Sequence, residues 1–597
     1  MADLPFHDQT DFADADRGFA ARLDPALIRS ADGRIVWNAD AYRFLEQETP
    51  ASADPSLWRQ SRLCAKQGLY EVTEGVWQVR GLDLSNMTLV EGERGVVVID
   101  PLLSTECAEA ALRLYRGHRG DRPVTGVIYT HSHVDHYGGV RGVTDGRDIP
   151  IIAPAGFLEH AVAENVYAGT AMVRRGVYMY GMALPVSPEG QIGCGLGLTT
   201  SQGTVSLLPP TVDVTSTGQL ETVDGVRIVF QLTPGTEAPA EMNLLLPDLR
   251  ALCLAENATH TQHNLGTLRG AQVRDARMWS RYLNQVLDLF VPHADVAFAS
   301  HHWPTWGRER ITRLVQDQRD LYAYLHDQTL RMINQGLTAT EIAERMELPP
   351  GLETTWSTRG YYGSVSHNVK AIYQRYLGWF DGNPAHLWEH PPVEQSRRYV
   401  ECLGGPSATV AMATRYIQDG DLRFAATLLN HAVFAAPSHA EARRRLTEVY
   451  TRLGQHAENG VWRNFYLTAA LELTARHTFP SGADTAAPDV LTALTLDQLL
   501  DAVAIRVNGP KAWNETLSID WNLTDTGEHR RTVLSNGALI IGPGGPADLR
   551  LRLSKPEFLG LLKGRPPGDH EGDPGTLTRL LGLLDDPDPG FAVVTPG

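Results

Sequence analysis

The chain has 597 residues, of which 43% are hydrophobic and 21% are charged. This composition excludes a disordered chain and a coiled coil, and the length predicts three or four domains at about 150 residues each. The formal net charge of −17 disfavours a broad surface for nucleic acid or for an anionic membrane, so we expect neither partner.

The cysteines and the N-terminus bear on the compartment. The five cysteines are scattered without a Cys-x-x-Cys pair, which argues against a disulfide framework and a thiolate zinc cluster. The opening stretch, MADLPFHDQTDF, is acidic where a signal peptide is basic, and no apolar run follows it. No segment approaches the roughly 18 apolar residues of a membrane span. We therefore expect a cytoplasmic protein, and export to the periplasm or the medium by another route stays open.

Short β-branched runs predict strands from Gly75 onward. Val76–Val79, Asn86–Val90 and Gly95–Asp100 are typical of an antiparallel meander, and Val124–Tyr129 predicts a further strand. Later strand-like runs alternate with helical stretches. The strands are expected at Val226–Leu232, Met242–Leu246, Ala251–Ala255 and Val296–Ser300, and the helices at Arg274–Phe290 and Arg308–Asn334. Sheet layers covered by helices are the simplest architecture for residues 75–390.

The pattern changes after Pro391-Pro392. Residues 405–475 are rich in Ala, Leu and Arg at helical spacing, with turns predicted at 419–421 and 436–438. Such helical hairpins resemble a tetratricopeptide-like array, although no clean repeat is visible. We expect this surface to dock on its own chain or on another subunit.

A third pattern begins at Ala486 and predicts a small α/β domain. A helix is expected at Leu496–Val507, and Asn536-Gly537 is typical of a hairpin turn. The strands are expected at Thr516–Leu523, Arg531–Leu534, Ala538–Ile541 and Leu549–Leu553. The predicted domains are therefore 1–392, 393–482 and 483–597.

The strongest chemical signal is His131-x-His133-x-Asp135-His136, directly after a predicted strand. In an extended segment His131 and His133 point the same way, and three imidazoles with a carboxylate suit zinc or a similar divalent ion. The alternative is a polar loop whose histidines only form hydrogen bonds. The spacing and the preceding strand favour the metal site.

Four residues cannot complete two coordination spheres, so other strand ends must contribute. Glu237 follows the run 226–232, Glu256 follows 251–255, and His301-His302 follow 296–300. Polar groups next to buried strands are costly unless they are paired or metal-bound. For Glu237 and Glu241 the alternative is an exposed loop carboxylate.

These residues resemble a known family. THSHVDH is similar to the signature of the metallo-β-lactamase superfamily, and several longer stretches resemble its alkylsulfatases, the type III sulfatases that hydrolyse dodecyl sulfate. These stretches are PGTEAPAEMN, LAENATHTQHNLGTLRGAQVRD, ASHHWPTWG and RGYYGSVSHNVKAIYQRYLGWFDGNP. The resemblance implies an α+β chain with three parts: a metallo-β-lactamase αββα sandwich, an all-α dimerisation domain that makes a homodimer, and a C-terminal sterol-carrier-protein-like domain.

The resemblance also implies a binuclear zinc centre. One ion would be bound by His131, His133 and Glu237, and the other by Asp135, His136 and His301, with Glu256 shared. The catalytic metal-bound water would be held by Asp135 and Glu256. Which glutamate bridges stays open, as does the choice between His301 and its neighbour His302.

The family's sulfate-binding stretch corresponds to 264–269, with Asn264, Thr267 and Arg269 as contacts and Arg274 as a further cation. Arginine suits a tetrahedral oxyanion, whereas the alternative for either arginine is a surface ion pair. His260 and His263 are expected either to orient the metal ligands or to be ordinary core histidines.

The implied activity is zinc-dependent hydrolysis of alkyl sulfate esters to an alcohol and inorganic sulfate, with a small-molecule alkyl sulfate as substrate. Attack at carbon or at sulfur stays open, as do chain length and the preference for primary or secondary esters. The alternatives are another hydrolase of this fold, acting on thioesters, lactams or phosphodiesters, and a lipid-binding protein with a vestigial site. Glu237 and Glu256 argue against the other hydrolases, whose members usually carry His or Asp there.

Overall fold

Two β-sheets lie at the centre of the N-terminal part of the chain. The structure, a computed structural model, describes residues 4–474 and 488–596. The first sheet has the strand order β1-β4-β5-β6-β7-β8-β9-β10 and the second β11-β12-β13-β14-β15-β16. The first comprises β1 (Phe19–Ala21), β4 (Gly68–Thr73), β5 (Val76–Arg80), β6 (Met87–Glu91), β7 (Val96–Ile99), β8 (Val124–Ile128), β9 (Ile151–Pro154) and β10 (Val212–Val214). The second comprises β11 (Leu220–Val223), β12 (Val226–Leu232), β13 (Met242–Leu246), β14 (Ala251–Cys253), β15 (Val296–Phe298) and β16 (Thr305–Trp306).

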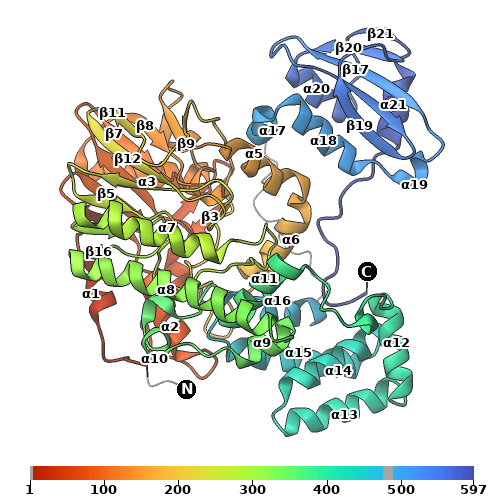
Figure 1. Ribbon diagram of the computed structural model, residues 1–597, viewed down its shortest axis with the longest axis horizontal. Coiled ribbons are helices and arrows are strands. Elements are labelled where there is room, and N and C mark those ends of the chain that lie inside the picture. Colours follow the sequence, from red (N-terminus) through yellow and green to blue (C-terminus); the bar gives the residue numbers. More distant parts are fainter. Residues whose placement is uncertain (1–3, 475–487, 597) are drawn as a thin grey trace.

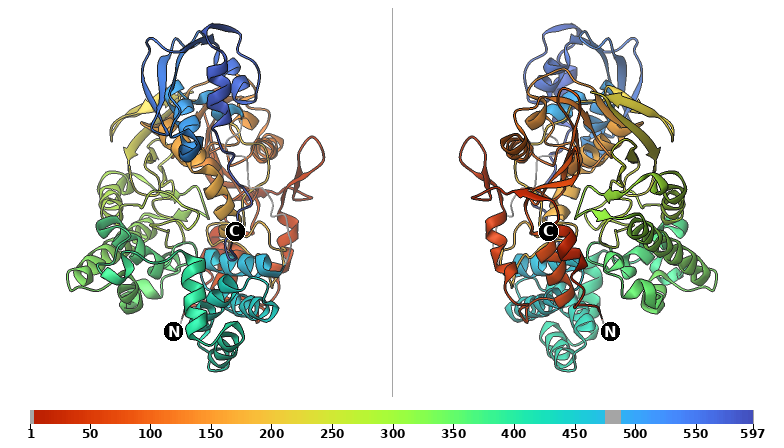
Figure 2. Two further views of the ribbon diagram at one scale, coloured as in Figure 1. Left: turned by 90° about the vertical axis from the view of Figure 1, so that its right-hand side faces the viewer. Right: turned by 90° about the vertical axis from the view of Figure 1, so that its left-hand side faces the viewer.

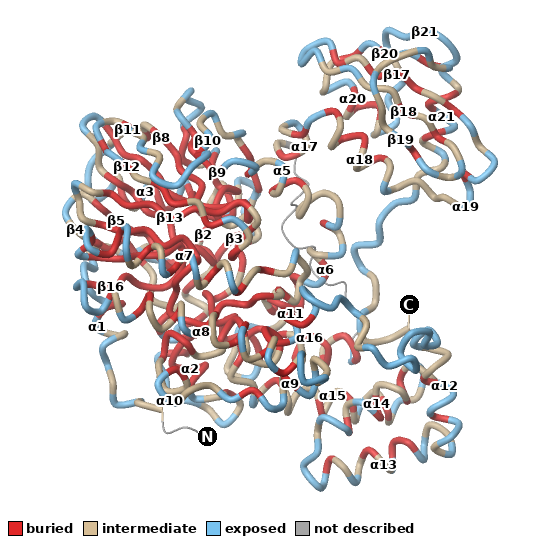
Figure 3. The backbone as a smooth tube through the Cα atoms, in the orientation of Figure 1, coloured by how far each residue is buried: buried red, intermediate tan, exposed pale blue. Residues whose placement is uncertain are grey.

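The two sheets pack face to face because their strands are apolar on the facing sides. Along β7, Val97 and Ile99 pack into the core between the sheets, against Phe230 and Leu244 of the second sheet. Val98 points to the opposite face and joins the outer core of the first sheet, as the two-residue period of a strand requires. The central strands are therefore buried on both faces, as Figure 3 shows.

Helices cover the outer face of each sheet. Helix α3 (Thr105–Arg119) packs on the first sheet, whereas α7 (Ala276–Leu289), α8 (Arg308–Ile333) and α11 (Val365–Leu377) build the core outside the second. The layer order is helix, sheet, sheet, helix. The predicted αββα sandwich is confirmed.

The predicted strands are present, and some of them are one or two residues shorter than expected. Strands β5, β6 and β7 pair antiparallel, which confirms the meander. β14 ends at Cys253 and β15 at Phe298, two residues before the predicted ends. Ala255 has φ 46°, a left-handed conformation that ends the extended run and turns the chain toward Glu256.

The remaining elements of this part lie before, between and after the sheet strands. They are α1 (Thr10–Asp16), β2 (Leu27–Arg29), β3 (Ile35–Asn38), η1 (Ala39–Glu46), α2 (Pro55–Cys64), η2 (Val134–His136), α4 (Arg141–Thr144), α5 (Phe157–Val162), η3 (Ala163–Tyr167), α6 (Gly169–Met179), η4 (Val291–His293), α9 (Ala339–Arg345), α10 (Pro350–Glu353), η5 (Trp356–Thr358) and η6 (Pro384–His386).

Antiparallel helices follow Pro391. They are α12 (Pro392–Cys402), α13 (Pro406–Gln418), α14 (Leu422–Ala435), α15 (Ala440–Gln455) and α16 (Gly460–Thr474). The turns predicted at 419–421 and 436–438 separate α13 from α14 and α14 from α15. Leu429 and Leu446 lie in the core between them, which explains the helical spacing of the apolar residues.

The C-terminal part is a five-stranded sheet covered by helices, in the order β19-β18-β17-β20-β21. Its elements are α17 (Pro488–Ala493), α18 (Leu496–Arg506), α19 (Gly509–Ala512), β17 (Leu517–Leu523), β18 (His529–Ser535), β19 (Ala538–Pro543), β20 (Leu549–Leu553), α20 (Lys555–Leu562), β21 (Asp569–Gly572) and α21 (Gly575–Gly582). Asn536 and Gly537 both have positive φ and form the turn between β18 and β19, which confirms the hairpin. The boundary predicted between 482 and 483 lies outside the described residues.

The helical and C-terminal parts lie at opposite ends of the molecule, with the sandwich between and beside them (Figure 2). Within 4–474 and 488–596, no helix is long and apolar enough to cross a membrane.

Candidate metal centre

The THSHVDH segment begins where β8 ends, at the edge where the two sheets meet. His131 forms an isolated antiparallel bridge with Glu241, and the amide of Met242 donates to the Thr130 carbonyl at 3.0 Å. These contacts join the end of a first-sheet strand to the start of β13 in the second sheet. Residues far apart in the sequence therefore meet at one edge of the sandwich.

A first cluster contains His131, His133 and Glu237. Glu237 Oε2 lies 2.7 Å from His133 Nδ1 and 3.1 Å from His131 Nε2. All three side chains are buried. One carboxylate oxygen and two imidazole nitrogens thus converge on one point.

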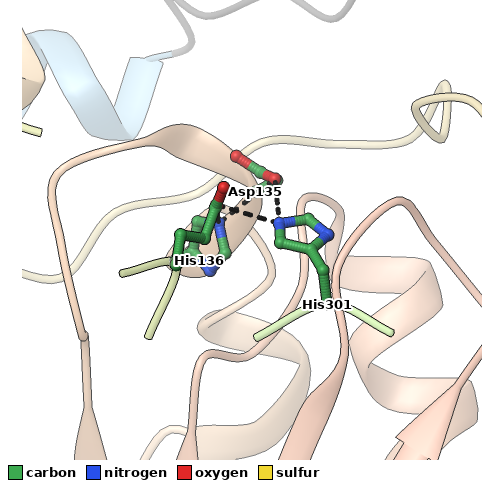
Figure 4. A group of neighbouring side chains, drawn as sticks. Asp135, His136 and His301 are labelled. Carbon is green, nitrogen blue, oxygen red and sulfur yellow. Dashed lines mark hydrogen bonds and ion pairs between the residues drawn. The ribbon is translucent and has the colours of Figure 1, made fainter. Parts of the chain in front are cut away.

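A second cluster contains Asp135, His136 and His301. Asp135 Oδ2 lies 3.2 Å from His136 Nε2 and 3.7 Å from His301 Nε2. Figure 4 shows the three side chains pointing toward one another.

Glu256 lies between the two clusters. Its Oε1 is 2.9 Å from Nε2 of both His136 and His301 and 3.4 Å from His131 Nε2. Its Oε2 interacts with His263 Nε2 at 2.7 Å. One carboxylate oxygen therefore contacts histidines of both groups.

This arrangement fits metal ions better than hydrogen bonds. The ligand atoms of each group lie within 4.8 Å of one another. Within the described residues, His131 Nε2, His136 Nε2 and Glu237 Oε2 are buried, and their close imidazole–carboxylate contacts do not have the geometry of hydrogen bonds. A buried polar atom left unpaired costs about 1–3 kcal/mol, and coordination of a cation would satisfy all three.

The charge balance also favours a cation. Burial alone would raise the pKa of Glu237, but Arg274 and His133 hold that pKa well below its usual range. Burial alone would lower the pKa of His133, but Glu237 and Glu164 raise that pKa to about 10. Carboxylates that raise the pKa of a buried imidazole in this way also favour a divalent cation at the same place.

Neighbouring groups orient the histidines. Asp100 Oδ2 interacts with His136 Nδ1 at 3.0 Å and accepts from the Ser300 hydroxyl at 2.6 Å. His301 Nδ1 lies 3.0 Å from the carbonyl of Leu84. Each contact leaves Nε2 facing the clusters, as in many histidine ligands of metals. Asp100 was not among the site residues predicted from the sequence, although it is a carboxylate directly after an apolar strand, the pattern that identified Glu256.

Glu237 and Glu241 are both buried, so the alternative of exposed loop carboxylates is wrong. The carboxylate of Glu241 accepts from the Thr236 hydroxyl at 2.5 Å and from the amide of Glu237 at 2.9 Å. Its other oxygen accepts from the amide of Glu256 at 3.3 Å. Glu241 thus fixes the backbone of two cluster residues.

The four residues predicted to bind sulfate lie on the segment after Glu256. Arg274 is buried and donates to Glu237 Oε1 at 2.5 Å, so it is not a surface ion pair. It also donates to the side chain and the carbonyl of Asn264. Thr267 is buried beside Met179, and Arg269 is partly buried.

The three further histidines have different surroundings. His263 contacts Glu256 as described above. His302 Nε2 lies 3.0 Å from the Gly195 carbonyl and 3.2 Å from Gln60 Nε2, which places its ring away from the clusters. His260 stacks on Trp303 with ring centroids 4.6 Å apart. The structure therefore brings His301, and not His302, to the metal ligands.

Glu164 also reaches the site, and the sequence argument did not include it. It lies on η3, where no strand end or motif marks it. Its Oε2 is 3.3 Å from His133 Nε2, and it forms an ion pair with Arg269.

A pocket opens beside the clusters. His133, Asp135, Glu164 and Arg269 line its polar end. Its apolar wall comprises Leu84, Leu103, Val134, Met172, Val173, Tyr180 and Met182. The site can therefore take a ligand with a charged head and an apolar tail.

Three parts of the chain match known protein families. Residues 80–301 match the metallo-beta-lactamase superfamily, residues 338–476 match the alkyl sulfatase dimerisation family, and residues 484–596 match the alkyl sulfatase C-terminal family.

Curated relatives match along the whole chain. A linear primary-alkylsulfatase from Pseudomonas is 46% identical over 615 residues, covering 100% of this chain and 91% of that protein. The alkyl/aryl-sulfatase BDS1 from Saccharomyces cerevisiae is 44% identical and covers 100% and 94%. An (R)-specific secondary-alkylsulfatase from Pseudomonas is 42% identical and covers 100% and 92%.

A solved structure has the same fold. The stereoselective inverting sec-alkylsulfatase Pisa1 from Pseudomonas matches with a TM-score of 0.96 and 40% identity, covering 100% of this chain and 96% of that one.

Proposed function

We propose, from the premise that this chain belongs to the alkylsulfatase family of the metallo-β-lactamase superfamily, that it hydrolyses alkyl sulfate esters to an alcohol and inorganic sulfate. The chain is thus a sulfuric ester hydrolase with a metal cofactor. The observation that carries the proposal is the convergence of two histidine–carboxylate groups on Glu256, next to the buried Arg274.

Zinc is the proposed metal, with two ions in each chain. One would be bound by His131, His133 and Glu237 and the other by Asp135, His136 and His301. Nitrogen and carboxylate ligands suit zinc. Since Glu256 Oε1 contacts histidines of both groups, Glu256 is the proposed bridge.

Bound zinc would supply a water molecule ionised near neutral pH, by lowering its pKa from about 15.7 to about 7. Asp135 and Glu256 carry the carboxylate oxygens that would hold this water in place. Arg269, Arg274, Asn264 and Thr267 would bind the sulfate group. Guanidinium groups form paired hydrogen bonds with a tetrahedral oxyanion and neutralise the charge that develops as sulfate leaves.

The apolar wall of the pocket is the proposed place for the start of the alkyl chain. Met172, Tyr180 and Met182 lie on this wall. Each buried methylene contributes about 0.8 kcal/mol, so an alkyl tail would add binding energy that a short ester lacks. The C-terminal part, proposed to be sterol-carrier-protein-like, would bind the far end of longer tails.

A homodimer is the proposed assembly. Residues 338–476 match a dimerisation family, and this range contains exposed aromatic side chains. Trp379 is 74% exposed and Trp388 is 96% exposed, which is costly for large apolar groups unless a partner covers them.

A reducing compartment is also proposed, as the composition predicted. All five cysteines lie in the described residues and none forms a disulfide. Free cysteines are usual in a reducing compartment, so a cytoplasmic location is proposed, with export by another route left open.

A substrate panel tests the function. Purified protein is assayed with dodecyl sulfate, nitrocefin and a lactoyl-thioester, each with and without a chelator. Sulfate release that stops on chelation supports the proposal. Hydrolysis of nitrocefin or the thioester in place of dodecyl sulfate would assign another hydrolase activity, and no turnover with no bound metal would support a vestigial site.

A further inference from the structure

Glu164 connects the metal centre to the sulfate site. It lies on the π-helix η3, outside both sheets, and its side chain is only 11% exposed. One oxygen faces His133 Nε2 at 3.3 Å, and the other pairs with Arg269. A single carboxylate therefore touches a metal ligand and a sulfate-binding arginine.

The contact with His133 has the geometry of a supporting carboxylate. His133 Nδ1 faces Glu237 at 2.7 Å, so Nε2 is the nitrogen left over when this ring binds a metal. Metal-bound histidines usually donate their second N–H to a carboxylate or a carbonyl, which fixes the ring and its tautomer. Glu164 Oε2 occupies that position.

The C-terminal part of the chain holds Glu164 in place. Val162 is buried in the C-terminal core, where Leu158 and Val166 pack as well. The Tyr167 hydroxyl donates to Asp501 on α18 at 3.3 Å, and Figure 1 shows α5 beside α17. The segment that carries Glu164 thus packs on the C-terminal core and on the core of the sandwich, and its carboxylate reaches the metal site.

We propose that Glu164 is a positioning residue that orients His133 for metal binding and holds Arg269 toward the sulfate, on a segment that the sandwich and the docked C-terminal domain hold together. The inference rests on the proposed function for the role of Arg269. The part concerning His133 depends only on metal binding.

The test measures zinc affinity without substrate, by competition with a chromophoric chelator. E164A removes the acceptor of the His133 N–H, and we expect zinc affinity to fall about 10–100-fold, the usual effect of removing such a partner. E164Q keeps a carbonyl oxygen for His133, so its zinc affinity stays near that of the unmodified chain. It loses the ion pair with Arg269, so KM for dodecyl sulfate changes while the bound zinc does not.

Glu159 provides the matched control, because it is an exposed glutamate on the adjacent α5. E159A should change neither zinc affinity nor KM. If E164A does not fold, E164D replaces it, because the shorter side chain keeps the charge but no longer reaches His133.

Unchanged zinc affinity in E164A, or in E164D where that variant replaces it, would overturn the proposal. An equal loss of zinc affinity in E164A and E164Q would also overturn it. The proposed role of Glu164 is to accept the hydrogen bond of His133, and the glutamine of E164Q would still accept it without the negative charge. Failure of the chain to hydrolyse any sulfate ester would refute the proposed function and leave the zinc result intact, so the two failures are distinguishable.

Discussion

The buried carboxylate of Glu241 accepts the backbone amide hydrogen of Glu237 at 2.9 Å. The same side chain accepts the amide hydrogen of Glu256 at 3.3 Å. One buried carboxylate therefore fixes the backbone of both glutamates proposed as metal ligands.

Replacing Glu241 tests whether its carboxylate stabilises the backbone around the metal ligands. E241A leaves buried amides unpaired, each worth about 1–3 kcal/mol, so we expect a lower melting temperature of the metal-free protein and fewer zinc ions retained after dialysis. E347A, at an exposed glutamate, is the control. Wild-type melting and zinc content in E241A would show that the amides find other partners.

Replacing Arg269 and replacing Arg274 are expected to have different effects on zinc content. R269A removes a charged contact to sulfate and should reduce kcat/KM for dodecyl sulfate about 10–100-fold with zinc content unchanged, because such hydrogen bonds contribute about 1.5–3 kcal/mol. R274A should reduce both kcat/KM and the zinc content, since Arg274 also donates to Glu237. Metal analysis alongside kinetics separates the two, and equal zinc loss in both variants would contradict the assignment.

The sequence located polar residues just beyond the strand ends, because an apolar run followed by a polar side chain marks the edge of a buried sheet. That rule located Glu256 and His301 before any geometry was known. It did not separate His301 from His302, since adjacent residues point to opposite sides and only the chain path after Ser300 decides which ring turns inward.

Other parts of the site leave no local pattern. Glu164 lies in a short helical segment that no strand end or motif marks, and packing against the sandwich and the C-terminal domain brings it to His133. Glu241 is one of several carboxylates near β13, and its burial follows from the bridge to His131. Such tertiary contacts are invisible to spacing arguments.

Stability should depend on pH through His367. Trp462 Nε1 on α16 donates to His367 Nδ1 at 3.0 Å, and burial, with the charge of Lys370, lowers the pKa of His367 to about 3. The unfolded chain binds a proton near pH 6.5, so the stability that neutral His367 contributes is complete above pH 6.5 and is lost as the pH falls toward 3.

We expect the loss to reach about 2 kcal/mol between pH 6.5 and pH 5. H367Q does not titrate, so its melting temperature should fall less than that of the unmodified chain between pH 7.5 and pH 5.5. If the melting temperatures of H367Q and the unmodified chain fall by the same amount across this pH range, the prediction is contradicted.

The exposed tryptophans near α12 are expected to lie in a dimer interface. The double variant W379A/W388A should sediment as a monomer at concentrations where the unmodified chain is a dimer. W513A removes a tryptophan that is 66% exposed on the C-terminal part, and this control should stay dimeric. A dimer that survives the double substitution would place the interface elsewhere.

The central claim is that the two histidine–carboxylate groups bind a pair of metal ions on which sulfate ester hydrolysis depends. The most direct test adds zinc stepwise to chelator-stripped protein and follows sulfate release from dodecyl sulfate. We predict no release from the stripped protein, and activity that rises to a plateau at about two zinc ions per chain. Full activity without metal, or a rate that does not respond to added zinc, would contradict the account.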